Sequence, residues 1–419
     1  MLTNQEKEQI NEMFKKLDPK KFWTLKATEK EAAKKKEKPK TVEEKMIEFA
    51  RSCNYRHPSQ TLILDLGDDH WESVFTTDEL SELEEDYGNP LLLPVAEPIG
   101  DKFTELLEKA KAPKDVYKYG QRIEHDPIDD PLLAWLTLTF MSVSLLFMNH
   151  GDTKERYLEA DTNYGHHQFT YGLTDYFNKY VFMCHTYRKE KSSQANATAS
   201  NCKRKLSAVE EVERKIMGRK MDALYIGGEK EVGCMEVGSE RDQTKEWKDS
   251  MVKMPVVMQD QLREIVQEAP QLKHKVDIVG YSIHGNQITM LDMDVPKGYV
   301  SRIRRIKPLT YPTCSEDFVL RLIPLIELAI IAKEKMEKTL HLYRNTLIGL
   351  QMARHTTPVL PLCPFSSSPS ANNSTTGSTS SLLSSSINDP LSSSTSTSAS
   401  SSSKNELSVS ASKRQKQTV

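Results

Sequence analysis

The stretch Lys215–Gly238 reads KIMGRKMDALYIGGEKEVGCMEVG, and it decides the fold that the sequence predicts. It holds two short apolar runs, residues 221–226 and residues 232–238, on either side of Gly227-Gly228. Glycine takes up the positive φ angles of a tight turn without a steric penalty. We therefore expect a β-hairpin whose two strands come from this stretch.

Each of the two runs carries one carboxylate, Asp222 in the first and Glu236 in the second. A carboxylate on a buried strand is unfavourable unless an opposite charge or hydrogen bonds compensate for it. Hard divalent cations prefer carboxylate oxygens as ligands. The pair therefore predicts a divalent-metal site, and Mg²⁺ is the expected cofactor. Two half-exposed acids at strand ends beside a glycine turn are the alternative interpretation.

The spacing of these acids resembles the core of the PD-(D/E)XK nucleases, in which a strand-borne aspartate precedes an acid-x-lysine triplet on the next strand. In addition, GRKMDALYI followed by EVGCMEVG is similar to an uncharacterised protein family found widely in Mucoromycotan fungi, over roughly Tyr157 to Lys307. The resemblance implies a restriction-endonuclease-like α/β (α+β) fold, with a small mixed central sheet flanked by helices. It also implies Mg²⁺-dependent hydrolysis of phosphodiesters.

The third position of the triplet is Gly238 here, so a catalytic lysine would have to come from another element. The following segment repeats apolar residues at steps of three and four, which is typical of a helix, and Pro255 should kink or divide it. Its early lysines, Lys245 and Lys248, are the candidates, with ordinary surface lysines as the alternative. The resemblance further implies a metal-binding glutamate on a first core helix, for which Glu159 or Glu155 is the candidate.

Three further strands are predicted at residues 276–283, 287–294 and 299–306 from their β-branched content and intervening turns. In the last of them Arg302 and Arg304 alternate with an isoleucine, so both arginines should face one side of the sheet.

The arginines of this strand form the most coherent basic patch of the sequence together with Lys297, Arg305 and Lys307. Such a patch is suited to a sequence-independent contact with a DNA or RNA backbone. The alternative is an edge strand that its charges protect against aggregation.

Three other segments have clear local patterns. The uncharged run 132–148 predicts a buried helix rather than a membrane anchor, because acidic residues precede it and no basic flank is present. A long helix is predicted over residues 317–351, and the small polar residues of 189–206 predict a loop.

The composition changes divide the chain into four parts. Residues 1–60 predict a charged arm that is mostly helical or flexible, and residues 61–130 an acidic, partly ordered segment. Residues 131–355 are the expected PD-(D/E)XK-like domain. The Ser/Thr-rich residues 356–419 cannot bury enough apolar surface to fold, so they predict a disordered tail.

The acidic segment carries Asp65, Asp68, Asp69 and His70, which resemble a metal cluster but lack a defined ligand spacing. An arm that docks on a protein partner is the preferred interpretation of this segment.

The net charge of −2 excludes a globally basic nucleic-acid binder, so such binding would depend on local patches. The six cysteines form no C-x-x-C pair, and no apolar signal segment begins the chain. We expect an intracellular protein, nuclear or cytoplasmic, with weak basic signals near residues 34–40 and 413–416 favouring the nucleus slightly. The predicted function is a nuclease-like domain that binds and hydrolyses nucleic acid or has lost catalysis. A non-enzymatic interaction or nucleic-acid-binding protein is the alternative.

Overall fold

The chain is described by a computed structural model that covers residues 1–85, 88–150, 185–187, 191–202, 215–238, 248–284, 286–312, 314–349 and 359–362. All of these residues belong to one compact unit, Met1–Pro369. The predicted tail, residues 356–419, lies outside the described residues except for 359–362.

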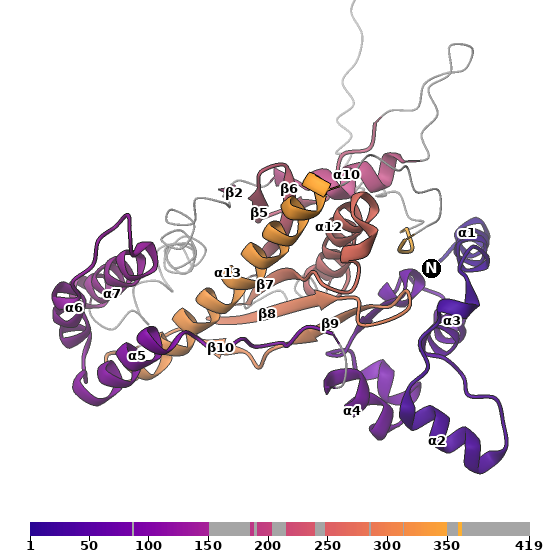
Figure 1. The fold of residues 1–419 in the computed structure, drawn as a ribbon, viewed down its shortest axis with the longest axis horizontal. Helices are drawn as coiled ribbons and strands as arrows, with labels where there is room; N and C mark the ends of the chain where they lie inside the picture. The colour runs from indigo at the N-terminus through magenta and orange to yellow at the C-terminus, as the bar shows by residue number, and fades with distance from the viewer. Residues whose placement is uncertain are drawn as a thin grey trace, which may run out of the picture. The chain divides into compact units, whose positions relative to one another are not determined.

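A mixed β-sheet forms the centre of this unit, as the sequence predicted (Figure 1). Among the described residues eight strands belong to it, in the order β1-β9-β8-β7-β6-β5-β2, with β10 also pairing with β8. These strands are β1 (Ile63–Asp65), β2 (His185–Tyr187), β5 (Ala223–Gly227), β6 (Lys230–Gly238), β7 (Ile278–His284), β8 (Gln287–Asp294), β9 (Ser301–Arg305) and β10 (Leu309–Thr310). A separate two-stranded sheet pairs β3 (Lys191–Ser192) with β4 (Lys220–Met221).

The predicted hairpin is present as the antiparallel pair β5–β6. Gly228 lies in its turn with a φ of +66°, a conformation that glycine adopts without strain. Strand β7 then pairs with β6 in parallel. A parallel neighbour requires a crossover connection, and the chain between these two strands contains helix α12 (Met254–Glu268). The three predicted strands over residues 276–306 are also confirmed, as β7, β8 and β9 in antiparallel succession.

Helices cover both faces of the sheet. A Cβ atom built on Gly280 of β7 would lie 2.8 Å from the sulfur of Met258, so this face meets α12. A Cβ on Gly233 of β6 would lie 3.2 Å from Met336 of α13 (Phe318–Gly349), so the opposite face meets α13. Figure 1 shows α13 running across the strands as one long helix. The other α-helices among the described residues are α1 (Asn4–Lys15), α2 (Lys26–Lys35), α3 (Val42–Ser52), α4 (Thr77–Glu85), α5 (Glu97–Lys109), α6 (Pro113–Arg122), α7 (Pro131–His150) and α10 (Gln194–Asn201).

Helix α7 is the apolar run that the sequence predicted to be buried. Trp135, Leu136 and Phe140 are at most 1% exposed and belong to the main hydrophobic core. Within the part of the chain that the structure describes, no helix combines the length and the apolar character that a membrane crossing requires.

Residues 1–60 are mostly helical, which was one of the two predicted alternatives, but they are a packed part of the fold and not a separate arm. They form α1, α2 and α3, and their apolar residues build a second core in which Trp23 and Met46 are fully buried. Tyr299 and Val300, which precede β9, belong to the same core. The N–H groups of Trp23 and Tyr299 both donate to the Glu43 carboxylate, over 2.7 and 2.9 Å. The dense lysines and glutamates of this region therefore cover an ordered, apolar interior.

The expected domain boundary at residue 131 is likewise corrected. Strand β1, from the acidic segment, pairs in parallel with β9, so residues on both sides of that boundary share one sheet. The predicted loop over residues 189–206 also contains helix α10, whose first turn is capped by the Ser193 hydroxyl. Serine is favoured at this position because its oxygen accepts an otherwise unpaired backbone N–H.

Candidate active site

Asp222 and Glu236 are brought together by the β5–β6 hairpin. Asp222 directly precedes β5, whose first residue, Ala223, pairs with Met235, the residue before Glu236. The negative charge of Asp222 acts on the Glu236 carboxyl and raises its pKa, which shows that the two acids are close. The Asp222 carboxylate accepts a hydrogen bond from the Val237 N–H over 2.7 Å, which holds it against the strand that carries Glu236.

A lysine from the next helical element completes this group. The Lys253 ammonium lies 2.6 Å from Oε1 of Glu236 and 3.9 Å from Oδ1 of Asp249. Lys253 ends a short π-helix, Asp249–Lys253, which runs directly into α12. π-Helical turns are rare and often occur at functional sites. This turn presents Asp249 and Lys253 together to the α12 face of β6.

The carboxyl group of Glu236 has an unusually high pKa for a glutamate. Burial raises the pKa of Glu236 to about 7, and the negative charges of Asp222 and Asp249 act in the same direction. The positive charge and the hydrogen bond of Lys253 oppose this rise. Glu236 and Asp249 therefore share the Lys253 ammonium, and Asp222 adds a third negative charge nearby. Carboxylate oxygens are the ligands that a hard divalent ion such as Mg²⁺ prefers.

The other predicted residues of this site have different outcomes. Lys245 and Glu159 lie outside the described residues, as does Glu155. Lys248 is exposed at the residue that precedes the π-helix, and the structure places a different lysine, Lys253, on Glu236. Sequence reasoning missed Lys253, although it is the lysine next to the Met254-Pro255 start of α12.

The basic patch predicted on β9 is wrong, because its arginines are buried in ion pairs. The Arg302 side chain has no exposed surface and binds Asp294 through two hydrogen bonds of 3.0 and 2.7 Å. Arg304 lies 2.8 Å from Asp292. Both arginines do face one side of the sheet, as expected, but this side is covered by α13, whose Lys335 joins the same network 3.1 Å from Asp292. Neither guanidinium can reach a nucleic-acid backbone, and of the five residues of the predicted patch only Lys297 and Lys307 are exposed.

Arg305 faces the other side of the sheet and supports the candidate site instead. It lies 2.6 Å from Asp65 of β1, and it donates hydrogen bonds to the hydroxyl and the carbonyl oxygen of Ser250 over 3.0 and 2.9 Å. Ser250 lies in the π-helix that carries Lys253. The Asp65–Arg305 pair thus fixes the position of this π-helix.

A second set of hydrogen bonds holds β6 against the helices on its α12 face. Glu231 accepts hydrogen bonds of 2.6 Å from the Ser193 hydroxyl and from the Gln194 N–H at the start of α10. On the same helix Asn196 donates to Asp260 of α12 over 2.7 Å. Burial raises the pKa of Asp260 to about 7. These contacts tie α10 and α12 to the strand that carries Glu236.

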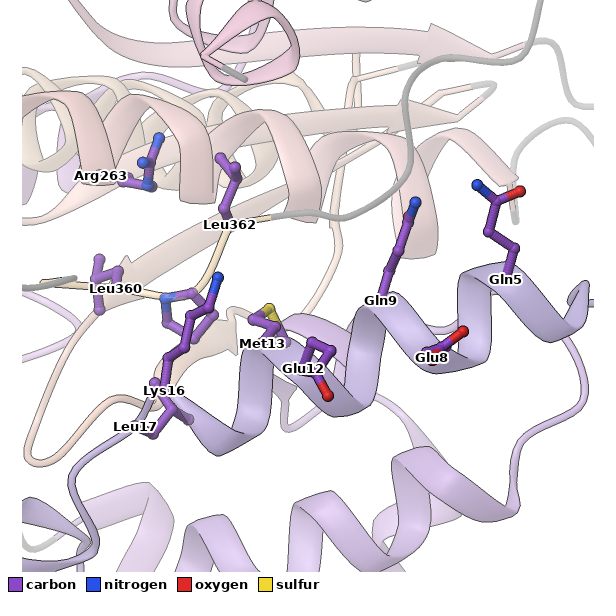
Figure 2. A pocket seen from close by; sticks show the side chains of 11 residues that line it. Gln5, Glu8, Gln9, Glu12, Met13, Lys16, Leu17, Arg263, Leu360 and Leu362 are labelled. Atoms are coloured by element: carbon purple, nitrogen blue, oxygen red, sulfur yellow. The ribbon is translucent and has the colours of Figure 1, made fainter. Parts of the chain in front are cut away.

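The cavity drawn in Figure 2 does not include any candidate site residue. It has a volume of about 470 Å³ and lies between α1, Arg263 of α12 and the segment 359–362. Figure 2 shows Leu360 and Leu362 between Arg263 and the end of α1, where Lys16 and Met13 extend toward them. Leu360 is only 2% exposed, so this segment is packed on the fold after α13 ends.

Comparisons with protein-family models, with curated proteins and with solved structures found no match to this chain. The chemistry of the candidate site therefore rests on its own residues.

Proposed function

We propose that this protein is a divalent-metal-dependent phosphodiesterase of the PD-(D/E)XK type that acts on nucleic acid. The observation that carries this function is the Lys253 ammonium, 2.6 Å from Glu236, whose carboxyl group is also close enough to Asp222 to be affected by its negative charge. A lysine was the element missing from the strand motif, since Gly238 stands in its place. A helix-borne lysine at the same carboxylate supplies the positive charge from a neighbouring element.

Asp222 and Glu236 are the residues that would hold the metal, and Asp249 adds negative charge beside them. When bound, Mg²⁺ would polarise the scissile phosphate and lower the pKa of an attacking water. Carboxylate oxygens are the ligands that Mg²⁺ prefers, and it is commonly bound through one or two of them.

Lys253 would orient the attacking water and stabilise the negative charge that develops on the phosphate. An ammonium held in place before the reaction is effective because no reorganisation is needed as that charge develops. The Arg305–Ser250 contacts limit the movement of the π-helix and so support this geometry.

Contacts to the substrate must be provided by residues other than the buried arginines of β9. Lys248 is exposed five residues before Lys253 and is suited to a phosphate near the scissile bond. Loss of catalysis with retained nucleic-acid binding, and a purely protein-binding role, are the alternatives, and the experiment below separates them.

The test is cleavage of plasmid and single-stranded nucleic acid by the full chain with Mg²⁺ or Mn²⁺. The full chain is needed because β1 completes the sheet that carries the site. Asp222→Asn and Glu236→Gln are expected to abolish cleavage. Lys253→Met is expected to lower its rate by roughly 100-fold, the usual effect of removing one preorganised electrostatic group. Lys248→Ala, the matched lysine control, should weaken substrate binding and leave the rate at saturation unchanged.

Two outcomes would overturn the enzymatic assignment. Salt-sensitive nucleic-acid binding without any cleavage would favour a degenerate nuclease fold that only binds. Absence of both cleavage and binding would favour the interaction protein. If Lys253→Met kept full cleavage activity and Lys248→Ala lost it, Lys248 and not Lys253 would be the catalytic lysine.

A further inference from the structure

A group of possible metal ligands lies far from Glu236 in the sequence, around β1. His57, Asp68 and His70 bring their ligand atoms within 4.8 Å of one another, and they are the one such group of histidine, cysteine and acidic residues within the described ranges. Nε2 of His57 lies 2.8 Å from one oxygen of Asp68, and Nδ1 of His70 lies 2.7 Å from the other. One carboxylate therefore joins two imidazoles.

The local fold positions these three side chains. His57 precedes the 3₁₀ turn η2 (Pro58–Thr61), and Asp68 precedes the 3₁₀ turn η3 (Asp69–Ser73), which contains His70. The two turns lie before and after β1, so the ligands come from both ends of that strand. This proximity explains how residues without a recognisable sequence spacing meet.

The surroundings resemble those of a metal site in depth and access. The His57 side chain is 3% exposed and that of Asp68 is 14% exposed, whereas the His70 side chain is 53% exposed and leaves a path from solvent. Aromatic rings of Phe49 and Trp71 lie 5.2 and 6.0 Å from the His57 ring, between centroids. The cluster is thus walled by apolar groups on its inner side and open at one ligand.

A second contact orients the buried imidazole. Nδ1 of His57 lies 2.8 Å from the Ser59 hydroxyl and 3.1 Å from the Ser59 N–H. Without a metal the Ser59 N–H donates to Nδ1, and the ring proton on Nε2 points to Asp68. With a metal at Nε2 the ring proton would be on Nδ1 and would donate to the Ser59 hydroxyl, and the Ser59 N–H would have to turn away from Nδ1. Such a partner on the second nitrogen is the usual support of a metal-bound histidine.

We propose that His57, Asp68 and His70 bind one first-row transition-metal dication, with Zn²⁺ as the best fit. Two imidazoles and one carboxylate are the donors that Zn²⁺ takes in three-ligand sites, with water in the fourth position. Imidazole nitrogen excludes Mg²⁺ as the preferred ion, because Mg²⁺ selects oxygen ligands. The site ties η2 to η3 and so fixes β1, whose Asp65 holds Arg305. It is independent of the proposed phosphodiesterase function.

The experiment uses the full chain, freed of metal with a chelator and titrated with Co²⁺, whose visible absorption reports a low coordination number with nitrogen ligands. We expect one Co²⁺ per chain, displacement by one equivalent of Zn²⁺, and no displacement by excess Mg²⁺. His70→Ala should weaken Co²⁺ binding by roughly 100-fold or more, since even the loss of a group that only hydrogen-bonds to a metal ligand weakens metal binding about 10- to 100-fold. His70 is exposed, so the urea midpoint of the metal-free variant should not change.

Two further variants make the result specific. His341→Ala removes an exposed histidine of α13 and should leave Co²⁺ affinity unchanged. Asp222→Asn with Glu236→Gln removes the proposed Mg²⁺ site and should leave the visible spectrum unchanged. Equal Co²⁺ affinity in the native chain and in His70→Ala would overturn the site, as would a spectrum that disappears in the Asp222/Glu236 variant. Failure of cleavage in the previous experiment would not affect these outcomes.

Discussion

Removal of the Arg302 guanidinium is the sharpest test of the buried charge network between β8, β9 and α13. Arg302 has no exposed surface. It makes a bidentate pair with Asp294, and its third hydrogen bond goes from Nη1 to the carbonyl oxygen of Leu83 over 2.5 Å. Arg302→Ala therefore leaves a buried carboxylate and a buried carbonyl without their main partner.

The expected loss of stability follows from these contacts. Removal of one partner of a buried ion pair destabilises a protein by roughly 3–5 kcal/mol, because the remaining charge is left desolvated. In Arg302→Ala the Asp294 carboxylate still has Arg304 at 3.7 Å. The expected decrease in the free energy of unfolding is therefore near the lower end of this range, at about 3 kcal/mol. Urea titration followed by far-ultraviolet circular dichroism measures the free energy of unfolding directly.

A matched arginine provides the control. Arg321 lies 2.6 Å from Asp317, as close as any of the buried pairs, but its side chain is 39% exposed. Arg321→Ala should lower the free energy of unfolding by less than about 0.5 kcal/mol, as is usual for an exposed helical pair. The double variant Arg302→Ala/Asp294→Ala should lower the free energy of unfolding by less than the sum of the two single variants. A loss below about 1 kcal/mol for Arg302→Ala would refute the burial of this guanidinium and restore it as a surface residue.

Three further predictions concern other parts of the fold. Asp260→Asn should gain stability relative to the native chain as the pH rises from about 4, the ordinary pKa of an aspartic acid, to about 7, the pKa that burial gives Asp260. In that interval the unfolded chain has lost the Asp260 proton and the folded chain still holds it, so the native chain loses stability as the pH rises. Paired urea titrations would show a gain of roughly a few kcal/mol by pH 7 and no further change above it, and a difference independent of pH would contradict this. Trp23→Ala should lower the free energy of unfolding by roughly 3–5 kcal/mol because the indole is fully buried, whereas a flexible arm predicts no change in the same titration. Gly298→Ala should lower the thermal midpoint, because Gly298 has a φ of +59° and the new Cβ would lie 1.9 Å from the Glu43 carboxylate. Gly100→Ala in α5 should raise the thermal midpoint, because nothing lies within 4 Å of the new Cβ. A shift of the midpoint in the same direction for both variants would disprove the steric reason.

The sheet could be predicted from the sequence wherever pairing is local. The β5–β6 hairpin is marked by its glycine turn, and β7, β8 and β9 by alternating patterns with short turns between them. Strand β1 could not be predicted with its partner, because three residues carry little pattern and its pairing with β9 spans most of the chain.

The charged residues were harder to predict than the strands. Arg302 and Arg304 were expected on the surface because arginine is rarely buried without a partner. Their partners were visible in the sequence, since Asp294 and Asp292 alternate on the preceding strand and lie opposite them in the antiparallel register. The register converts a basic patch and an acidic stretch into neutral buried pairs.

Of the candidate site, the sequence predicted only the two acids of the β5–β6 hairpin. Asp222 and Glu236 follow from the hairpin, whose geometry is local. Lys253 depends on a π-helical turn, which has no distinct sequence signal and which the Asp65–Arg305 pair holds from another edge of the sheet. The His57 cluster likewise arises only when two turns are folded around β1.

The shared carboxylate of Glu43 has a consequence for how the protein is made. It joins the backbone of Trp23 to that of Tyr299, and it contacts the latter across 256 residues of chain. The N-terminal helices therefore leave the ribosome with an apolar face that stays open until Tyr299 and Val300 have been synthesised. Long-range contacts of this kind slow folding and expose apolar surface to aggregation in the interval.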